Sequence, residues 1–327
     1  MRKVLFATTA LATAAGALAV ANADVSISGA QEWRYLSISD DYSSRSSDTD
    51  FTADTDVTIS FSTTTDSGLT MGMTSNISET VGATTTSSIS GDFGTITVSE
   101  GSTAVHAAGS YDVTSVGISG GHGDIAYTLV NSSGTEQTAV EIDEAQIDDT
   151  SSGAVIMYHS PTFGGFSFGV GTSHLTTSDD NTSMSMGAKY SGSMGDVSYT
   201  IGYASYDGVG ANTKGSHIGA NVSWDAITFG VGSSSNETSA SSKKETLSYS
   251  VNYAVSDDVT VNIGRSNSEN KMGSAADLEA SNTTIGVAYS VAPGLTASMS
   301  SHSVEFKSGG SVNNDGTVVQ AEIQMSF

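Results

Sequence analysis

The chain has 327 residues, 11 Lys and Arg against 35 Asp and Glu, and a formal net charge of −24. Such an acidic chain lacks the basic face that nucleic-acid binding requires, and the absence of cysteine excludes disulfide scaffolds, cysteine nucleophiles and thiolate metal sites. The length is compatible with one large β domain.

The first 23 residues have the composition of an export signal. A basic head (Met1–Lys3) precedes an apolar run (Val4–Val20), and Ala21–Ala23 has the small residues of a cleavage site. We expect a secretory signal peptide over 1–23 and a mature domain over 24–327 that is exported. A helical membrane anchor is the alternative interpretation, but a span needs about 20 apolar residues.

From Asp24 onward, apolar and small polar residues alternate with the period of a β-strand. Each alternating segment has one apolar face and one face of mostly Ser, Thr, Gly and Asn. No convincing helical period appears after residue 23. The clearest segment ends the chain, where polar residues separate Val319, Ala321, Ile323, Met325 and Phe327.

Short and long connections alternate along the chain. Seven short ones, rich in turn-forming residues, and eight longer ones imply 16 strands. A strand of about 10 residues tilted by about 45° covers the ~25 Å apolar band of an outer-membrane barrel. The short turns are expected at 65–68, 92–94, 161–165, 193–196, 225–226, 256–258 and 292–294, and the long loops at 37–50, 81–85, 101–152, 177–182, 207–214, 236–244, 269–280 and 307–316.

A 16-stranded barrel is too wide for side chains to fill, so its polar face lines water and its apolar face meets lipid. The sequence therefore predicts an all-β fold, a 16-stranded antiparallel transmembrane β-barrel. A secreted or surface-attached β-rich structural or adhesion protein is the alternative, since sandwiches share the alternation. Aromatic residues near expected strand ends suit interfacial girdles: Trp33, Tyr35, Phe61, Tyr158, Phe166, Tyr190, Trp224, Phe306 and Phe327.

Three stretches carry a resemblance to a known family. Thr64–Leu69 and Gly91–Ile96 look like the first two periplasmic turns of the general-diffusion porins of alphaproteobacteria, and Val155–Phe166 looks like their return from the third loop. The resemblance implies a homotrimeric 16-stranded pore in the outer membrane of a Gram-negative bacterium, with the third loop folded into the lumen. It also implies that Phe327 is the signal read by the barrel-assembly machinery.

The expected third loop, residues 101–152, is far longer than ordinary loops, and loops of that length are usually functional. It contains no Lys or Arg, and acids held inside a pore favour cations. We expect a passive diffusion channel for small hydrophilic solutes and ions, constricted by this loop and preferring cations. A solvated acidic surface loop is the alternative. The acids expected at the constriction are Asp112, Asp124, Glu136, Glu141, Asp143 and Glu144.

Few basic residues oppose these acids. Strand parity points Arg34 and Lys189 into the lumen, and Arg45 lies at the end of the first long loop. His217 and His302 also have inward parity. This departs from the family pattern, in which a cluster of basic residues faces the loop acids, and it indicates a net acidic channel.

No arrangement of catalytic residues is evident. None of the six His residues has a metal-ligand spacing, and no motif marks a Ser, His and acid set, so we expect neither enzyme activity nor a cofactor. Outer-membrane lipid and lipopolysaccharide are expected partners, and divalent ions would bridge anionic lipid to acidic loops. Ca²⁺ is a candidate ligand of loop acids, although none has EF-hand spacing and solvated acids are the alternative. The acids considered for Ca²⁺ are Asp148, Asp149, Asp179 and Asp180.

Overall fold

Strands dominate the part of the chain that the computed structural model describes. Among these residues, no helix is long and apolar enough to span a membrane. The predicted signal peptide lies outside them. The described residues are 24–40, 49–78, 82–100, 108–111, 113, 128–130, 136–138, 154–174, 182–208, 214–239, 242–271, 277–309 and 311–327.

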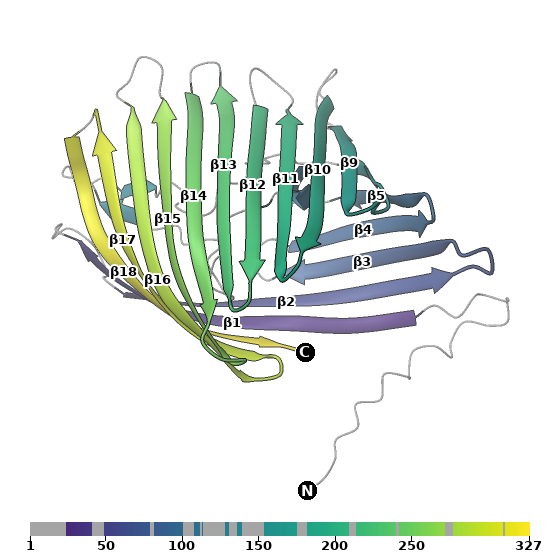
Figure 1. The fold of residues 1–327 in the computed structure, drawn as a ribbon, viewed down its shortest axis with the longest axis horizontal. Coiled ribbons are helices and arrows are strands. Elements are labelled where there is room, and N and C mark those ends of the chain that lie inside the picture. The colour runs from purple at the N-terminus through teal and green to yellow at the C-terminus, as the bar shows by residue number, and fades with distance from the viewer. Residues whose placement is uncertain are drawn as a thin grey trace, which may run out of the picture.

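Sixteen strands form one closed antiparallel barrel, which confirms the predicted fold (Figure 1). Chain neighbours pair, β5 pairs with β8 across the long insertion, and β1 closes on β18. The barrel strands are β1 (Asp24–Asp40), β2 (Thr49–Thr64), β3 (Thr70–Ser78), β4 (Gly82–Gly91), β5 (Gly94–Glu100), β8 (Ala154–His159), β9 (Phe166–His174), β10 (Thr182–Met194), β11 (Val197–Asp207), β12 (Lys214–Trp224), β13 (Ile227–Ser239), β14 (Ser242–Ala254), β15 (Val259–Lys271), β16 (Leu278–Ala292), β17 (Leu295–Ser308) and β18 (Ser311–Ser326).

Three short elements lie between β5 and β8. They are the 3-10 helix η1 (Ala108–Tyr111) and a separate hairpin of β6 (Thr128–Val130) and β7 (Glu136–Thr138). Their place in the chain is that of the expected third loop.

The seven expected tight turns all connect consecutive strands. Gly68, Gly195 and Gly294 have positive φ angles of 81°, 61° and 77° in three of these turns. Glycine suits these positions because an L side chain is strained in this backbone region.

Several strands continue further than the alternation indicated. β13 runs to Ser239 and β14 begins at Ser242, inside the loop expected at 236–244. β17 and β18 similarly leave only two residues of the loop expected at 307–316, and β4 begins at Gly82 within 81–85. Both faces carry polar residues at these strand ends, so backbone pairing continues where the period-two signal has disappeared.

Exposure follows strand parity. On β14, Leu247 and Tyr249 are each 46% exposed, whereas Thr246 and Ser248 between them are 4% and 2% exposed. In a soluble protein the apolar side chains would be the buried ones. Around this barrel the opposite recurs, with apolar side chains exposed outside and Ser, Thr and Asn buried on the inner face. The outward apolar band is the surface that a membrane barrel presents to lipid. The soluble secreted alternative is therefore not favoured.

One aromatic prediction is wrong. Phe306 lies on the inward face of β17 and is buried with Val304 and Val318, against partly buried Leu36 and Ile38. Phe306 has the same strand parity as His302 and Val304, which are also buried on the inner face. The predicted girdle residues that are exposed on the outer face include Tyr35, Phe166, Tyr190, Trp224 and Phe327.

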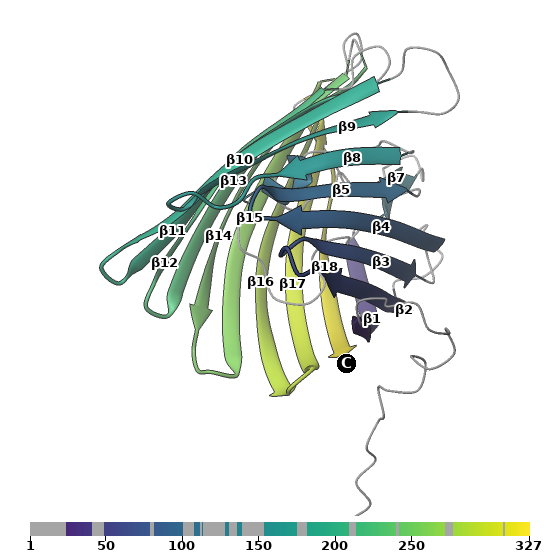
Figure 2. The same cartoon turned by 90° about the vertical axis from the view of Figure 1, so that its right-hand side faces the viewer.

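The wall is uneven in height. Strands β3, β4, β5, β8 and β9 have 6–10 residues, whereas β10–β18 have 11–16. Figure 2 shows the short strands stacked on one side and the long ones on the other. The C-terminal end lies beside β1 (Figure 1), where the backbone N–H groups of Gly29 and Phe327 donate to each other's carbonyl at 2.9 and 3.0 Å.

Candidate functional site

A row of glycines creates a groove on the inner wall of β9–β12. Gly169 pairs with Gly187, and Gly202 pairs with Gly219, on four adjacent strands. A Cβ at Gly187 would lie 2.6 Å from the Cβ of Tyr111, and one at Gly202 would lie 2.3 Å from the Tyr111 carbonyl oxygen. The missing side chains therefore leave the space in which this part of the insertion lies.

Tyr111 is the centre of these contacts. Its side chain is 3% exposed, its hydroxyl lies 3.2 Å from Nδ1 of His159, and its ring stacks on the His159 ring. Nζ of Lys189 lies 5.6 Å from the Tyr111 ring centroid, within the range of a cation–π interaction. Burial raises the pKa of the Tyr111 phenol, which keeps the hydroxyl neutral.

Val113 extends the same contact to β12. Nε2 of buried His217 lies 3.0 Å from the Val113 carbonyl oxygen, to which a protonated Nε2 donates. A Cβ at Gly219 would lie 1.6 Å from that oxygen, so no larger residue fits there without movement. Lys189 and His217 thus face inward and contact Tyr111 and Val113 at the wall.

Charged side chains lie on the inner face of β1, β2 and β18. The Arg34 guanidinium contacts the Glu32 carboxylate, and its Nε lies 3.7 Å from Oε2 of Glu322. Asp54 is the register partner of Glu32, and Asp56 is that of Ala30, so both belong to the same face. Four carboxylates therefore share this inner face with one guanidinium, and two of them contact it.

These two regions oppose each other across the barrel. In the closed strand order, β10 lies nine strands from β1 by way of β18 and seven by way of β2. Lys189 and Tyr111 are consequently on the wall that faces Arg34. Polar networks line the wall elsewhere, as where His302 contacts Thr284 Oγ1 at 3.0 Å and Ser300 Oγ at 2.8 Å. His302 has the inward parity that the sequence indicated.

Only part of the predicted site lies among the described residues. Arg34 and Lys189 face inward, as predicted. Arg34 contacts carboxylates of the barrel wall, whereas the sequence had indicated acids of the third loop as its partners. Glu136 begins β7, whose partner β6 comes within 8 Å of β18 by Cα distance. Outside the described residues lie Arg45, Asp112, Asp124, Glu141, Asp143, Glu144, Asp148, Asp149, Asp179 and Asp180.

The described residues contain no group of three or more His, Asp or Glu that could hold a metal ion.

Several residues of the candidate site were not predicted from the sequence. Parity on β1 and β18 places Glu32 and Glu322 inside, and register adds Asp54 and Asp56. Tyr111 has no local signal, because its partners lie on β8–β12. Glycine recurring at inward positions of successive strands was the available clue.

Comparison with known proteins agrees with this architecture. The sequence profile of Gram-negative porins matches residues 7–308. A triple mutant of the Rhodopseudomonas blastica porin superposes with a TM-score of 0.61 at 19% identity, covering 93% of this chain and 100% of the other. A loop-deleted form of OmpT, an outer membrane protein of Vibrio cholerae, gives 0.66 at 11% identity, with 93% and 99% covered. No curated protein matches the chain significantly.

Proposed function

Because the chain belongs to the family of Gram-negative porins, we propose that its barrel encloses a water-filled path through which small hydrophilic solutes and ions diffuse passively. Family and fold are those of an outer-membrane diffusion channel and not those of an enzyme. The hydroxyl and amide groups on the inner face support such a path, because they can replace part of a solute's hydration.

The channel prefers cations. The observation that carries this proposal is the inner face of β1, β2 and β18, where Glu32, Asp54, Asp56 and Glu322 outnumber Arg34. Carboxylates lining a pore lower the free energy of a passing cation and raise that of an anion. Lys189 on the opposite wall does not offset them, and the chain's net charge of −24 acts in the same direction.

Residues 101–152 form the constriction. The support comes from Tyr111 and Val113, which lie against the inner wall, and from β6, which approaches β18. A segment held at both places would narrow the lumen and bring its acids, Asp112, Asp124, Glu136, Glu141, Asp143 and Glu144, near the path of the ions.

The mature protein is a homotrimer, exported after cleavage of residues 1–23. The outward faces of β1–β4 and β8–β10 carry no Asp, Glu, Lys or Arg, and β5 between them has Glu100 alone at an outward position, so a second copy could contact this side with little burial of charge. Intact mass of the purified chain tests the cleavage after Ala23, and native mass spectrometry tests the trimer.

Single-channel recording in a planar bilayer under a KCl gradient tests the channel. We expect stepwise conductance in groups of three and a reversal potential on the cation side. A reversal potential on the anion side would retain the channel and contradict the cation preference. A folded, membrane-extracted sample that never conducts would overturn the open path itself.

A further inference from the structure

The methionines of the barrel wall lie in contrasting surroundings. Met157 is buried on the inner face of β8, with 6% of its surface exposed. Met299 is 54% exposed on the outer face of β17, and its register partner on β16 is the apolar Val287. Met184 and Met186 on β10 are 61% and 51% exposed. Met186 and Met299 are therefore matched in exposure and differ in their neighbours on the outer face.

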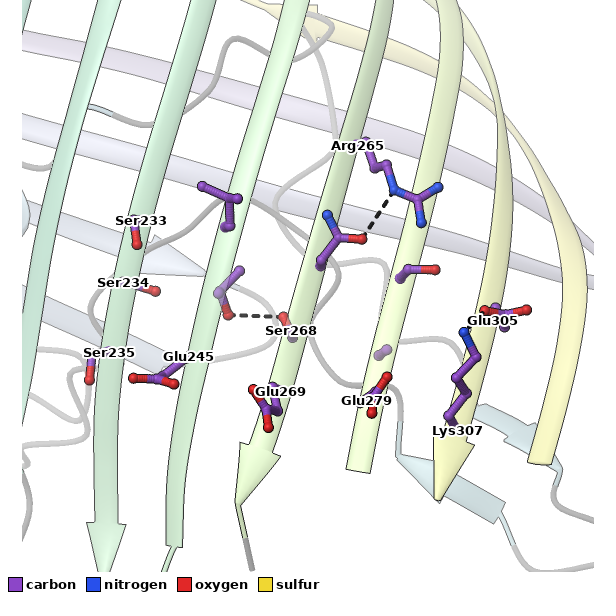
Figure 3. A pocket seen from close by; sticks show the side chains of 15 residues that line it. Ser233, Ser234, Ser235, Glu245, Arg265, Ser268, Glu269, Glu279, Glu305 and Lys307 are labelled. Atoms are coloured by element: carbon purple, nitrogen blue, oxygen red, sulfur yellow. Dashed lines mark hydrogen bonds and ion pairs between the residues drawn. The ribbon is translucent and has the colours of Figure 1, made fainter. Parts of the chain in front are cut away.

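Met186 begins a polar row on the outer face. Register partners follow one another from β10 to β17, and after Met186 each of them is Ser, Glu or Lys. They are Ser205, Ser216 and Ser235 on β11–β13, then three glutamates and Lys307 on β14–β17. Figure 3 shows the row from Ser235 to Lys307. The thioether of Met186 thus lies beside hydroxyl groups and not within the apolar band.

Met184 lies closer to the long-loop end of β10, which begins at Thr182. Its register partners are Thr172 and Asp207, and Oδ2 of Asp207 lies 3.6 Å from Nζ of Lys214. Charge on the lipid-facing side of a membrane barrel is costly at the bilayer midplane and tolerated near the interfaces. The charged pair therefore places Met184 at the edge of the apolar band, where water and dissolved molecules reach it.

The two methionines share one groove with these polar residues. It has a volume of about 400 Å³ and is lined by Met184, Met186 and Lys214, and by the hydroxyl-bearing Ser205 and Ser216. Most of its lining belongs to β11–β13, outside the uncharged face that a second copy could contact. Two thioethers thus lie in a hollow whose other lining is mostly polar.

We propose that Met184 and Met186 are a modification site, at which hydrogen peroxide oxidises the thioethers to sulfoxides and the groove accommodates the products. In this step a lone pair of Sδ attacks one oxygen of the peroxide, so that an S–O bond forms and the O–O bond breaks. The sulfur loses two electrons and the peroxide is reduced. The leaving hydroxide takes up the proton of the transferred oxygen and becomes water.

The groove suits the product because a sulfoxide oxygen accepts hydrogen bonds. The Lys214 ammonium and the hydroxyls of Ser205 and Ser216 are donors in its lining. At Met299 the same oxygen would face lipid, and at Met157 it would be buried, and a polar atom without a partner is costly in either place. Oxidation in the groove therefore consumes peroxide at the barrel surface without disturbing the barrel. The proposal rests on the outer-membrane placement of the protein and not on its conductance.

Peptide mass spectrometry of the full chain in phospholipid vesicles, treated with hydrogen peroxide, tests the site. We expect sulfoxide to form at Met184 and Met186 at least about fivefold faster than at Met299, because lipid covers Met299 and water reaches the groove. Flotation of the protein with the vesicles is verified first. Failure of membrane insertion is thereby distinguished from failure of the site.

Two double variants sharpen the test. Met184→Leu with Met186→Leu should take up two fewer oxygen atoms than the wild type, measured by intact mass at the dose that oxidises both residues. The matched control is Met71→Leu with Met73→Leu, which removes a pair of the same spacing on β3, where Met73 is the register partner of the apolar Phe61. This control should take up as much oxygen at that dose as the wild type.

Two results would overturn the site. One is sulfoxide formation at Met299 as fast as at Met184 and Met186. The other is loss of the folded barrel, or of its single-channel conductance, as sulfoxide forms at these two residues. Conductance recorded before peroxide treatment tests the channel separately, and the positions of the sulfoxides are determined whether or not the protein conducts.

Discussion

Gly187 and Tyr111 are in such close contact that a Cβ on the glycine would lie 2.6 Å from the Cβ of the tyrosine. The two residues are far apart in the chain, one on a barrel strand and one in the long insertion. Their contact holds the insertion against the inner wall at Tyr111. In the proposed channel, the width of the path therefore depends on an absent side chain as much as on those present.

Replacing Gly187 by Ala should displace the segment around Tyr111. Overpacking of this kind costs about 1–3 kcal/mol, and the segment can relieve it by leaving the wall. We expect a folded barrel with a larger and noisier single-channel conductance. Gly264→Ala is the matched control, because that glycine also faces inward and the nearest atom to its Cβ would be the Ser250 Cβ at 3.2 Å. Equal effects from both variants would contradict the groove.

Tyr111 itself supplies the second test. Tyr111→Ala removes the buried ring and should weaken docking of the segment by about 3–5 kcal/mol, as for other buried aromatics. Tyr111→Phe loses only the contact with His159 and should cost about 1 kcal/mol. Voltage ramps on single channels measure the difference: the Ala variant should close or fluctuate at lower voltage, whereas the Phe variant should resemble wild type. Identical behaviour of the two variants would mean that the ring does not hold the segment.

The acidic inner face predicts opposite effects from two substitutions. Asp54→Asn should lower the K⁺ to Cl⁻ permeability ratio, and Arg34→Gln should raise it. One charge about 4 Å from an ion in a water-like medium is worth about 1 kcal/mol, so each change should be at most about fivefold. Reversal potentials in a KCl gradient provide the measurement. Shifts in the same direction for both variants would show that global charge, and not this face, sets selectivity.

Phe327 and Gly29 give a test of barrel closure. A Cβ at Gly29 would lie 2.8 Å from the Phe327 ring and 3.1 Å from the Asp56 carbonyl oxygen. Gly29→Ala should therefore lower the temperature at which the barrel unfolds in detergent, while Gly264→Ala should change it less. Phe327→Ala should reduce the amount of barrel assembled in the outer membrane, and Phe327→Tyr should restore it. Normal assembly of Phe327→Ala would remove the proposed signal role.

The sequence was sufficient for the strand count and the tight turns. Alternation along the strands and turn residues between them are local properties, and a lumen face of Ser, Thr and Asn reads directly from parity. The strand ends at the long loops were harder to predict from the sequence. Paired strands continue there without an apolar alternation, as at Lys243, Glu245, Glu269 and Lys271. There the polar sequence resembles a loop although the backbone hydrogen bonds continue.

The long-range contacts of the site could not be predicted in the same way. Arg34 meets Glu322 only because the first and last strands pair, and Tyr111 meets Gly187 only because the insertion turns inward. A glycine on the inner face has the same appearance as ordinary lumen lining. Phe306 differs from these contacts, because its parity with His302 already indicated an inward position and only its aromatic character suggested the girdle.

The seam between β1 and β18, where Ala30 lies opposite Ser326, joins the two most distant parts of the described barrel. The hairpins around it are local and can form quickly, whereas the seam requires almost the entire chain to be in place. Until then, two strand edges and the apolar outer face are open together, which makes the unclosed chain prone to aggregation. The time that the chain spends with this seam open, and not the stability of the finished barrel, therefore determines how long the cell must protect it from aggregation.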